Sequence, residues 1–168
     1  METKPTFNRI PRRSVSAGCG ARQASPTVGS NPVILCVDDE PDLLTILRLF
    51  LSAQDLEVIP ASDAAEALSV LEQRRPDLII TDYAMPGMSG LELCRTLRDR
   101  ADTCEIPIIL YSGRDLWQDD YPRLFDRFVL KPAEFDVFIR TVRALLAAPR
   151  ARQLPRRGSG HRRHQSPK

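Results

Sequence analysis

The chain has 168 residues, enough for one ordinary domain but not comfortably for two. Its charge is uneven: residues 1–32 hold five basic and one acidic residue, residues 147–168 hold seven basic and none acidic, and the remaining 12 basic and 21 acidic residues fall in 33–146. An acidic core thus lies between two basic ends, and no apolar stretch is long enough for a membrane span or a signal-peptide core.

Both ends of the chain lack apolar periodicity and together hold seven of the 14 prolines. Segments this polar cannot bury enough apolar surface to offset the entropy that is lost on ordering them. We therefore expect disordered basic tails over 1–32 and 147–168, and one folded domain over 33–146. The Arg- and Ser-rich composition of 1–32 is also typical of an organelle transit peptide, although its prolines and glycines argue against an amphipathic helix.

Histidine and cysteine usage limits the kinds of metal site that the domain can hold. The two histidines, His161 and His164, lie in the C-terminal tail, so a His-based metal or catalytic site in the domain is excluded. The four cysteines form no C-x-x-C pair, and Cys36 and Cys94 fall inside apolar patterns. We expect free thiols in a reducing compartment, not disulfides or a zinc site.

Short apolar runs alternate with amphipathic segments from the start of the domain. The run at 33–37 predicts a first strand. Pro41 suits the first turn of a helix, and the apolar spacing after it predicts that helix over 41–53. A second strand is predicted at 56–59 and ends at Pro60.

The middle of the domain repeats this alternation. Asp63 with Glu66 resembles a capping box and predicts the start of a second helix. The apolar run at 78–81 predicts a third strand. A second capping-box pattern, Ser89 with Glu92, predicts the start of the next helix.

The last third of the domain is regular except for one stretch. A fourth strand is predicted at 107–111, closed by Ser112, and a fifth at 128–130. Between them, 114–125 is ambiguous, because a proline interrupts its apolar pattern, and we expect a short, irregular helix there. A final helix is predicted over 134–147.

These elements predict an α/β fold. Each strand is a short apolar run, which is typical of a parallel sheet that is covered by helices on both faces. Right-handed crossovers bring the carboxyl ends of all the strands to one edge. A doubly wound sheet of five strands most often has the flavodoxin-like order 2-1-3-4-5, which we expect here.

Polar side chains follow four of the five predicted strands. Asp38 and Asp39 follow the first, Asp82 the third, Ser112 the fourth and Lys131 the fifth. Three neighbouring carboxylates are unfavourable without a cation, and an all-oxygen ligand set suits a hard divalent ion, most simply Mg²⁺. A lysine and a hydroxyl beside them suit phosphoryl oxygens. The pattern predicts phosphoryl transfer to a carboxylate, with Asp82 as the nucleophile.

Each of these residues also has a purely structural interpretation. Asp82 alone fits a turn cap, and Asp38 and Asp39 fit helix capping. Lys131 alone fits a solvated lysine and Ser112 a turn residue. The five positions together favour the phosphoryl site.

Four short motifs in this order resemble the receiver domain of two-component response regulators, the CheY-like superfamily. The resemblance covers about 33–146, the whole predicted domain. The motifs are VDDE at 37–40, TDYAMPGMSG at 81–90, Ser112-Gly113 after an apolar strand, and VLKP at 129–132.

The resemblance implies an acidic, metal-binding pocket. Asp82 is implied to be the phosphorylated aspartate, and Asp39 and Asp82 to bind Mg²⁺ directly. Asp38 is implied to help indirectly, through water or a second contact. The backbone carbonyl of Ala84 is implied to be a further ligand.

The resemblance also implies a switch. The Ser112 hydroxyl turns towards the phosphoryl group, and Lys131 pairs with the phosphate, with a cis peptide before Pro132. Phe128 matches an aromatic residue that changes rotamer on activation; packing in the core is its plain alternative.

The chain departs from the family pattern between strands four and five. That segment is shorter than usual and lacks the small-residue turn before strand five, so the output surface is in question. Trp117 and Tyr121 lie there and fit either partner anchors or a staple between helix and sheet. Ala84 and Arg114 match positions that flank the phosphoryl site and influence dephosphorylation.

We expect a stand-alone, cytoplasmic receiver that takes phosphate from a histidine kinase or a histidine phosphotransfer protein, switches a protein-interaction surface and is not a dedicated enzyme. Two alternatives stay open. The basic tails favour binding to nucleic acid or another anionic surface. A receiver-like scaffold that no longer uses phosphate is the other.

Overall fold

The computed structural model describes residues 31–113 and 124–148. Most of both predicted tails, and most of the ambiguous segment 114–125, lie outside the described residues. The elements, in chain order, are β1 (Val33–Val37), α1 (Pro41–Ser52), β2 (Glu57–Ala61), α2 (Ala64–Gln73), β3 (Leu78–Thr81), α3 (Gly90–Asp99), β4 (Ile108–Ser112), β5 (Arg127–Leu130) and α4 (Phe135–Ala147). No helix among the described residues is long and apolar enough to cross a membrane.

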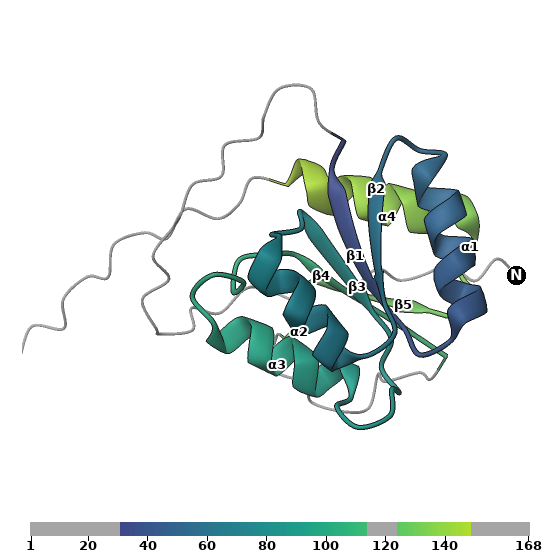
Figure 1. Ribbon diagram of the computed structural model, residues 1–168. Coiled ribbons are helices and arrows are strands. Elements are labelled where there is room, and N and C mark those ends of the chain that lie inside the picture. The colour runs from purple at the N-terminus through teal and green to yellow at the C-terminus, as the bar shows by residue number, and fades with distance from the viewer. Residues whose placement is uncertain (1–30, 114–123, 149–168) are drawn as a thin grey trace, which may run out of the picture.

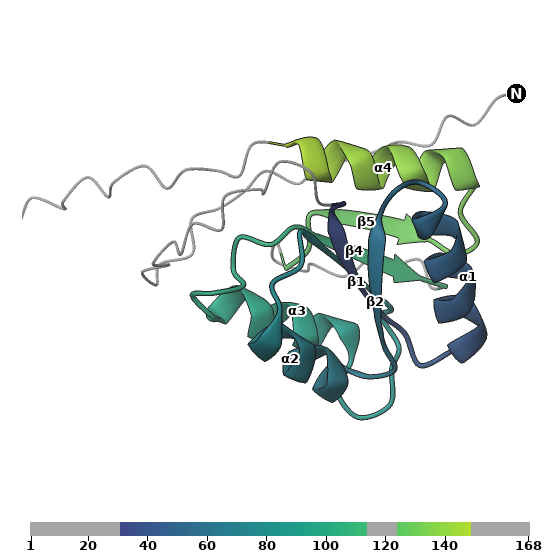
Figure 2. The ribbon, with the colours of Figure 1, turned by 45° about the horizontal axis from the view of Figure 1, so that its top comes forward.

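The five strands form one parallel sheet in the order β2-β1-β3-β4-β5, as the sequence predicted. Figures 1 and 2 show α1 and α4 on one face of the sheet and α2 and α3 on the other. Each layer has its own apolar core, one with α2 and α3 and one with α1 and α4. Both faces of the sheet are therefore buried, which is why the strands are nearly continuous apolar runs.

Side chains alternate between these two cores along each strand. In β1, Ile34 and Cys36 lie in the core beside α1 and α4, whereas Leu35 and Val37 lie in the core beside α2 and α3. The strands are in register, with Cys36 opposite Ile80 of β3. Residues two positions beyond these therefore leave the sheet on the α1/α4 side.

The element boundaries differ from the prediction at Pro60. We expected the second strand to end there, but β2 continues through Pro60 to Ala61. Since β2 pairs only with β1 in the described sheet, Pro60 sits on an edge strand, where a missing N–H removes no ladder bond.

The predicted helix starts are confirmed, with one difference. In α3, Ser89 and Glu92 form the full capping box. In α2, the Asp63 side chain accepts from the Glu66 N–H, but the Glu66 carboxylate accepts from Ser62 instead of returning to Asp63. The Asp63–Glu66 pattern is thus a side-chain N-cap in which the Glu66 carboxylate reaches back to Ser62.

The thiol prediction is confirmed for two cysteines. Cys36 and Cys94 are free and buried, and burial raises the pKa of each thiol to about 12. Cys104 is disulfide-bonded, so the prediction was wrong for it.

Candidate functional site

Lys131 joins two carboxylates at the carboxyl edge of the sheet. Its Nζ lies 2.7 Å from Asp38 Oδ2 and 2.6 Å from Asp82 Oδ1. The two acids follow the neighbouring strands β1 and β3, and Lys131 follows β5, so the bridge joins residues 93 and 49 positions apart in sequence. The topology therefore brings three of the predicted residues together.

Backbone hydrogen bonds extend the sheet ladder past the strand ends and fix these residues. The N–H of Asp82 donates to Val37 O at 2.9 Å, and the N–H of Asp38 donates to Ala61 O at 3.1 Å. The N–H of Lys131 donates to Ser112 O at 2.8 Å. Because the backbone N–H of each of these three residues is hydrogen-bonded to a neighbouring strand, their side chains leave the sheet in a fixed register.

The Lys131–Pro132 peptide is cis, as the resemblance to receiver domains implied. Cis bonds are rare outside X–Pro pairs and mark a defined turn. This turn carries the chain from β5 into α4 directly after Lys131.

The pairing of strands explains which residues share a face. Asp38 and Asp82 each follow by two positions a residue, Cys36 or Ile80, that lies in the α1/α4 core. Lys131 stands in the same relation to Val129 of that core. The period of two along a strand thus puts both carboxylates and the ammonium on one side of the sheet edge.

The carboxylates are nearly out of reach of water. Asp38 is 3% exposed and Asp82 is 6% exposed. The second oxygen of each accepts a backbone N–H, from Glu40 to Asp38 at 3.0 Å and from Ala84 to Asp82 at 2.5 Å. Both anions are therefore hydrogen-bonded, as burial requires.

The electrostatics of Lys131 follow from this arrangement. Partial burial on its own lowers the pKa of the ammonium, but the hydrogen bonds and charges of Asp38 and Asp82 outweigh it, and the net shift of the pKa is upward. Lys131 is thus held as a cation. Two buried anions share it, which leaves this cluster with one excess negative charge.

Asp39 and Ser112 stand apart from the bridge. Asp39 is exposed, whereas Ser112 is 1% exposed and accepts the Lys131 N–H through its backbone oxygen. No group of three or more His, Cys, Asp or Glu side chains surrounds a common metal position in 31–113 or 124–148. The three-carboxylate metal site therefore stays a prediction.

The donor set nevertheless fits a hard cation. The groups at this edge are carboxylate and carbonyl oxygens, with no His or Cys among them. The Asp38–Asp82–Lys131 cluster carries one excess negative charge. Ala84, whose carbonyl was predicted as a ligand, is exposed directly beside Asp82.

The loop from Asp82 to Gly90 is held against the site. The Gly90 N–H donates to Tyr83 O at 3.0 Å, and Thr81 Oγ1 donates to Asp82 O at 3.1 Å. A Cβ at Gly90 would clash with the backbone oxygen of Asp82. Position 90 therefore requires glycine, since the start of α3 packs on the backbone of the central aspartate.

Phe128 is half-buried and packs against the core beside α2 and α3. Its partner in register on β4 is Leu110. Leu124 and Phe125, at the end of the ambiguous segment, are buried in that same core. The predictions for Arg114, Trp117 and Tyr121 concern residues outside the described ranges.

One aromatic residue at the site was not singled out from the sequence. The Lys131 Nζ lies 5.1 Å from the ring centroid of Tyr111, the residue before Ser112. In the sequence, Tyr111 ends an apolar run and has the pattern of one more buried strand residue. Its position two residues after Ile109, which belongs to the α1/α4 core, was the available signal that it faces Lys131.

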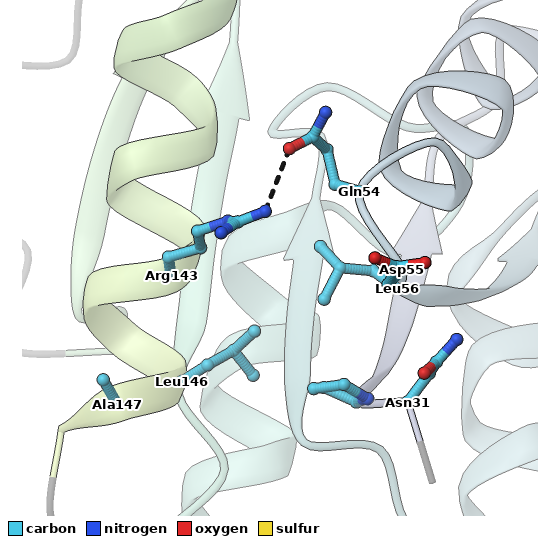
Figure 3. A pocket seen from close by; sticks show the side chains of 8 residues that line it. Asn31, Gln54, Asp55, Leu56, Arg143, Leu146 and Ala147 are labelled. Carbon is cyan, nitrogen blue, oxygen red and sulfur yellow. Dashed lines mark hydrogen bonds between the residues drawn. The ribbon is translucent and has the colours of Figure 1, made fainter.

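A shallow depression of about 620 Å³ lies at the opposite, amino edge of the sheet. Figure 3 shows Arg143 of α4 reaching over it to donate to the Gln54 side chain at 3.0 Å. It is lined by Asn31, Pro32, Gln54, Asp55, Leu56, Arg143, Leu146 and Ala147. None of these is a predicted site residue, so the hollow and the charged site are separate features.

Comparison with known proteins gives a consistent result. The family model described as the response regulator receiver domain matches residues 34–143. The phosphate regulon transcriptional regulatory protein PhoB of Rhizobium meliloti is 38% identical over 118 residues, which cover 68% of this chain and 52% of that protein. The transcriptional regulatory protein AfsQ1 of Streptomyces coelicolor is 35% identical over 121 residues, 68% of this chain and 51% of that protein.

Solved structures agree with these sequence matches. The response regulator protein TrrA of Thermotoga maritima, crystallised in complex with Mg²⁺-BeF, is 32% identical with a TM-score of 0.63. The match covers 68% of this chain and 98% of that one. The chain spans about half the length of the curated relatives but nearly all of this structural neighbour.

Proposed function

The chain belongs to the response regulator receiver family of two-component signalling proteins, and from this premise we propose that Asp82 accepts a phosphoryl group from the phosphohistidine of a sensor kinase or a histidine phosphotransfer protein. The observation that carries the proposal is the bridge of Lys131 to both Asp38 and Asp82. It brings the two buried carboxylates of Asp38 and Asp82 into contact with one cation at the sheet edge, an arrangement that supports Asp82 as the phosphoryl acceptor.

The transfer is an in-line displacement at phosphorus. An oxygen of Asp82 forms the new P–O bond as the P–N bond of the phosphohistidine breaks, and the leaving imidazole keeps its electron pair. Both Asp82 oxygens accept a hydrogen bond, one from the Ala84 N–H at 2.5 Å and the other from Lys131 Nζ at 2.6 Å, so the attacking oxygen must give up one of these bonds.

Mg²⁺ would be held by Asp39, Asp82 and the Ala84 carbonyl, with Asp38 helping indirectly, and when bound it neutralises charge on the donor and acceptor oxygens. The excess negative charge of the Asp38–Asp82–Lys131 cluster supports this assignment. Asp39 is exposed and would have to turn towards the cluster.

Lys131 and Ser112 would stabilise the transferred group. When an Asp82 oxygen becomes esterified, the Lys131 ammonium loses that anionic partner and can pair with a phosphoryl oxygen instead. Ser112 is buried at the end of β4, next to the strand that carries Lys131, and its hydroxyl would donate to a second phosphoryl oxygen. Phe128, on the next strand, would then change its packing and alter the surface that a downstream protein partner binds.

The test is phosphorylation with a small phosphodonor and Mg²⁺, followed by intact mass. We expect the mass of one phosphoryl group to be added to the chain, and peptide mapping to place it on Asp82. Asp82→Asn should abolish the addition, whereas Asp77→Asn, which changes a half-buried aspartate before β3, should retain it. No addition with any donor, and no binding of Mg²⁺, would refute the proposal.

A further inference from the structure

We propose that Tyr111 is a positioning residue for Lys131: its ring face forms the third wall of the ammonium site and keeps the lysine between Asp38 and Asp82. The inference rests on the proposed function, because the lysine it positions is the one assigned to the phosphoryl group. It concerns a residue to which the family motifs quoted above give no role.

The geometry of the ammonium carries the argument. A lysine ammonium has three protons, and two of them point to Asp38 Oδ2 at 2.7 Å and Asp82 Oδ1 at 2.6 Å. The Tyr111 ring centroid lies 5.1 Å from the same nitrogen, within the range of a cation–π interaction. Two anions and one ring face thus surround the cation.

The sheet fixes Tyr111 in this position. Tyr111 pairs in register with Val129 on β5, and both lie in the core beside α1 and α4. Lys131 follows Val129 by two residues and emerges on the same side. Its side chain therefore passes the ring on its way to the carboxylates.

The ring itself is held in place. Tyr111 is 9% exposed, and its ring lies 5.1 Å from that of Phe138 on α4, at an interplanar angle of 44°. Because Phe138 is 4% exposed, this packing resists rotation of the tyrosine. A rigid wall matters most when Asp82 is esterified and one of the two anionic partners of Lys131 is lost.

The ring also shields the lysine from water. The Lys131 side chain is 20% exposed, although it ends in a full charge at the sheet edge. Removing the ring would open this side of the ammonium to solvent and let the side chain take other rotamers. We expect phosphorylation to slow, since the cation would no longer be placed before the reaction.

The chain offers a direct readout of the lysine. Lys131 is the single lysine between Lys4 and Lys168, so labelling with an amine-directed acylating reagent gives one reporter and two internal references in each spectrum. We expect Lys131 to be protected relative to the two references in the wild type and in Tyr111→Phe. In Tyr111→Leu it should label about two- to thirtyfold faster, the range of cation–π strengths.

Ring electronics separate positioning from packing. Phenylalanine analogues with increasing fluorination at position 111 keep the ring shape but weaken its negative face. We expect labelling of Lys131 to rise, and the phosphorylation rate with a small donor to fall, stepwise along the series. Phe138→Leu, which removes the supporting ring but leaves Tyr111, is the packing control and should show a smaller effect on both readouts.

The outcomes distinguish the two proposals. If labelling and rate are flat along the fluorinated series while the wild type is phosphorylated, Tyr111 does not position Lys131 and the receiver function stands. If labelling rises along the series but no variant accepts phosphate, the ring contact stands and the proposed function falls. If Phe138→Leu matches Tyr111→Leu in both readouts, the effect is packing and the inference is overturned.

Discussion

Among the described residues, two ion clusters that are largely shielded from water lie on opposite faces of the sheet, and the charges that these residues bring together differ. At the carboxyl edge, Lys131 faces two aspartates, Asp38 and Asp82. On the α3 side, Arg98 pairs with Asp126 at 2.9 Å. Both clusters are largely shielded from water, so the difference is one of composition and not of depth.

The Arg98 cluster has the form of a structural clamp. The guanidinium also donates to the backbone oxygens of Cys104 and Ile106, at 3.1 and 2.7 Å, and Asp126 accepts the Ile108 N–H at 3.0 Å. The Arg98–Asp126 ion pair joins one cation to one anion, and backbone groups among the described residues take up further hydrogen bonds. The cluster joins α3, the loop before β4 and the residue before β5.

The Lys131 cluster is unbalanced by comparison, with two anions for one cation. Buried like charges cost stability, and such a cost is common where a site must bind a ligand or change state. The contrast suggests that charge balance in a buried cluster separates structural pairs from reactive ones. The following variants test that distinction.

The largest effect should follow from removing the cation of the balanced pair. Arg98→Met removes the ion pair with Asp126, whose side chain is 15% exposed, and we expect a loss of about 3–5 kcal/mol in the free energy of unfolding. Urea unfolding followed by circular dichroism measures it. At temperatures where the variant is folded, it should still be phosphorylated, and loss of phosphorylation in the folded protein would contradict a purely structural role.

The stability of the domain at alkaline pH depends on its two buried thiols, Cys36 and Cys94, each of which interacts electrostatically with one of the two clusters. Burial raises the pKa of both to about 12, with Asp38 adding to the shift at Cys36, and Arg98 opposing it at Cys94. Above pH 9 the unfolded chain loses these protons while the folded chain keeps them, so stability falls as pH rises, by about 1.4 kcal/mol per pH unit for each thiol.

The free energy of unfolding should be measured by urea unfolding between pH 8.5 and 10. Lys131 titrates above this range, because its pKa is raised above its ordinary value of 10.5. Cys36→Ala and Cys94→Ala should each remove about half of the pH slope, and the double variant nearly all of it. A slope that survives in the double variant would show that other groups carry the alkaline sensitivity.

Relieving the imbalance should stabilise the domain. Asp38→Asn keeps an oxygen for the Glu40 N–H but removes one of two buried negative charges, and we expect a gain of about 1 kcal/mol together with slower Mg²⁺-dependent phosphorylation. The matched variant Asp126→Asn should be destabilised instead. If urea unfolding shows that both variants change the free energy of unfolding in the same direction, the two clusters do not differ as proposed.

The smallest effect should come from an exposed pair. Arg74 and Glu57 form two hydrogen bonds at 2.6 and 2.7 Å, and both side chains are nearly half exposed. Solvent screens such pairs, so Arg74→Gln should leave the urea midpoint unchanged within error. A clear shift would mean that distance, not burial, decides which ion pairs stabilise this fold.

Much of this architecture was predictable because it depends on pattern. Short apolar runs and helical spacing gave the five strands, their order and the helices, and the ends of the strands located Asp38, Asp82 and Lys131. Pro60 was misjudged, because proline ends a central strand but not an edge strand, and the sequence alone did not make clear that β2 is an edge.

Side-chain arrangement at the site was less predictable. Strand register puts residues at one edge, but rotamers and face decide which of them touch. Asp38 and Asp82 share a face with Lys131, whereas Asp39 is exposed. Tyr111 was overlooked because an apolar run does not reveal that one of its members ends against a cation.

The proline on β2 has a further consequence, for self-association. An outer strand presents free backbone donors to which a strand from another molecule can add. At Pro60 there is no such donor, and Glu57 at the start of β2 carries a charge paired with Arg74. Pro60 therefore disfavours the addition of strands from other molecules at this edge of the sheet, and with it the growth of fibrils or dimers.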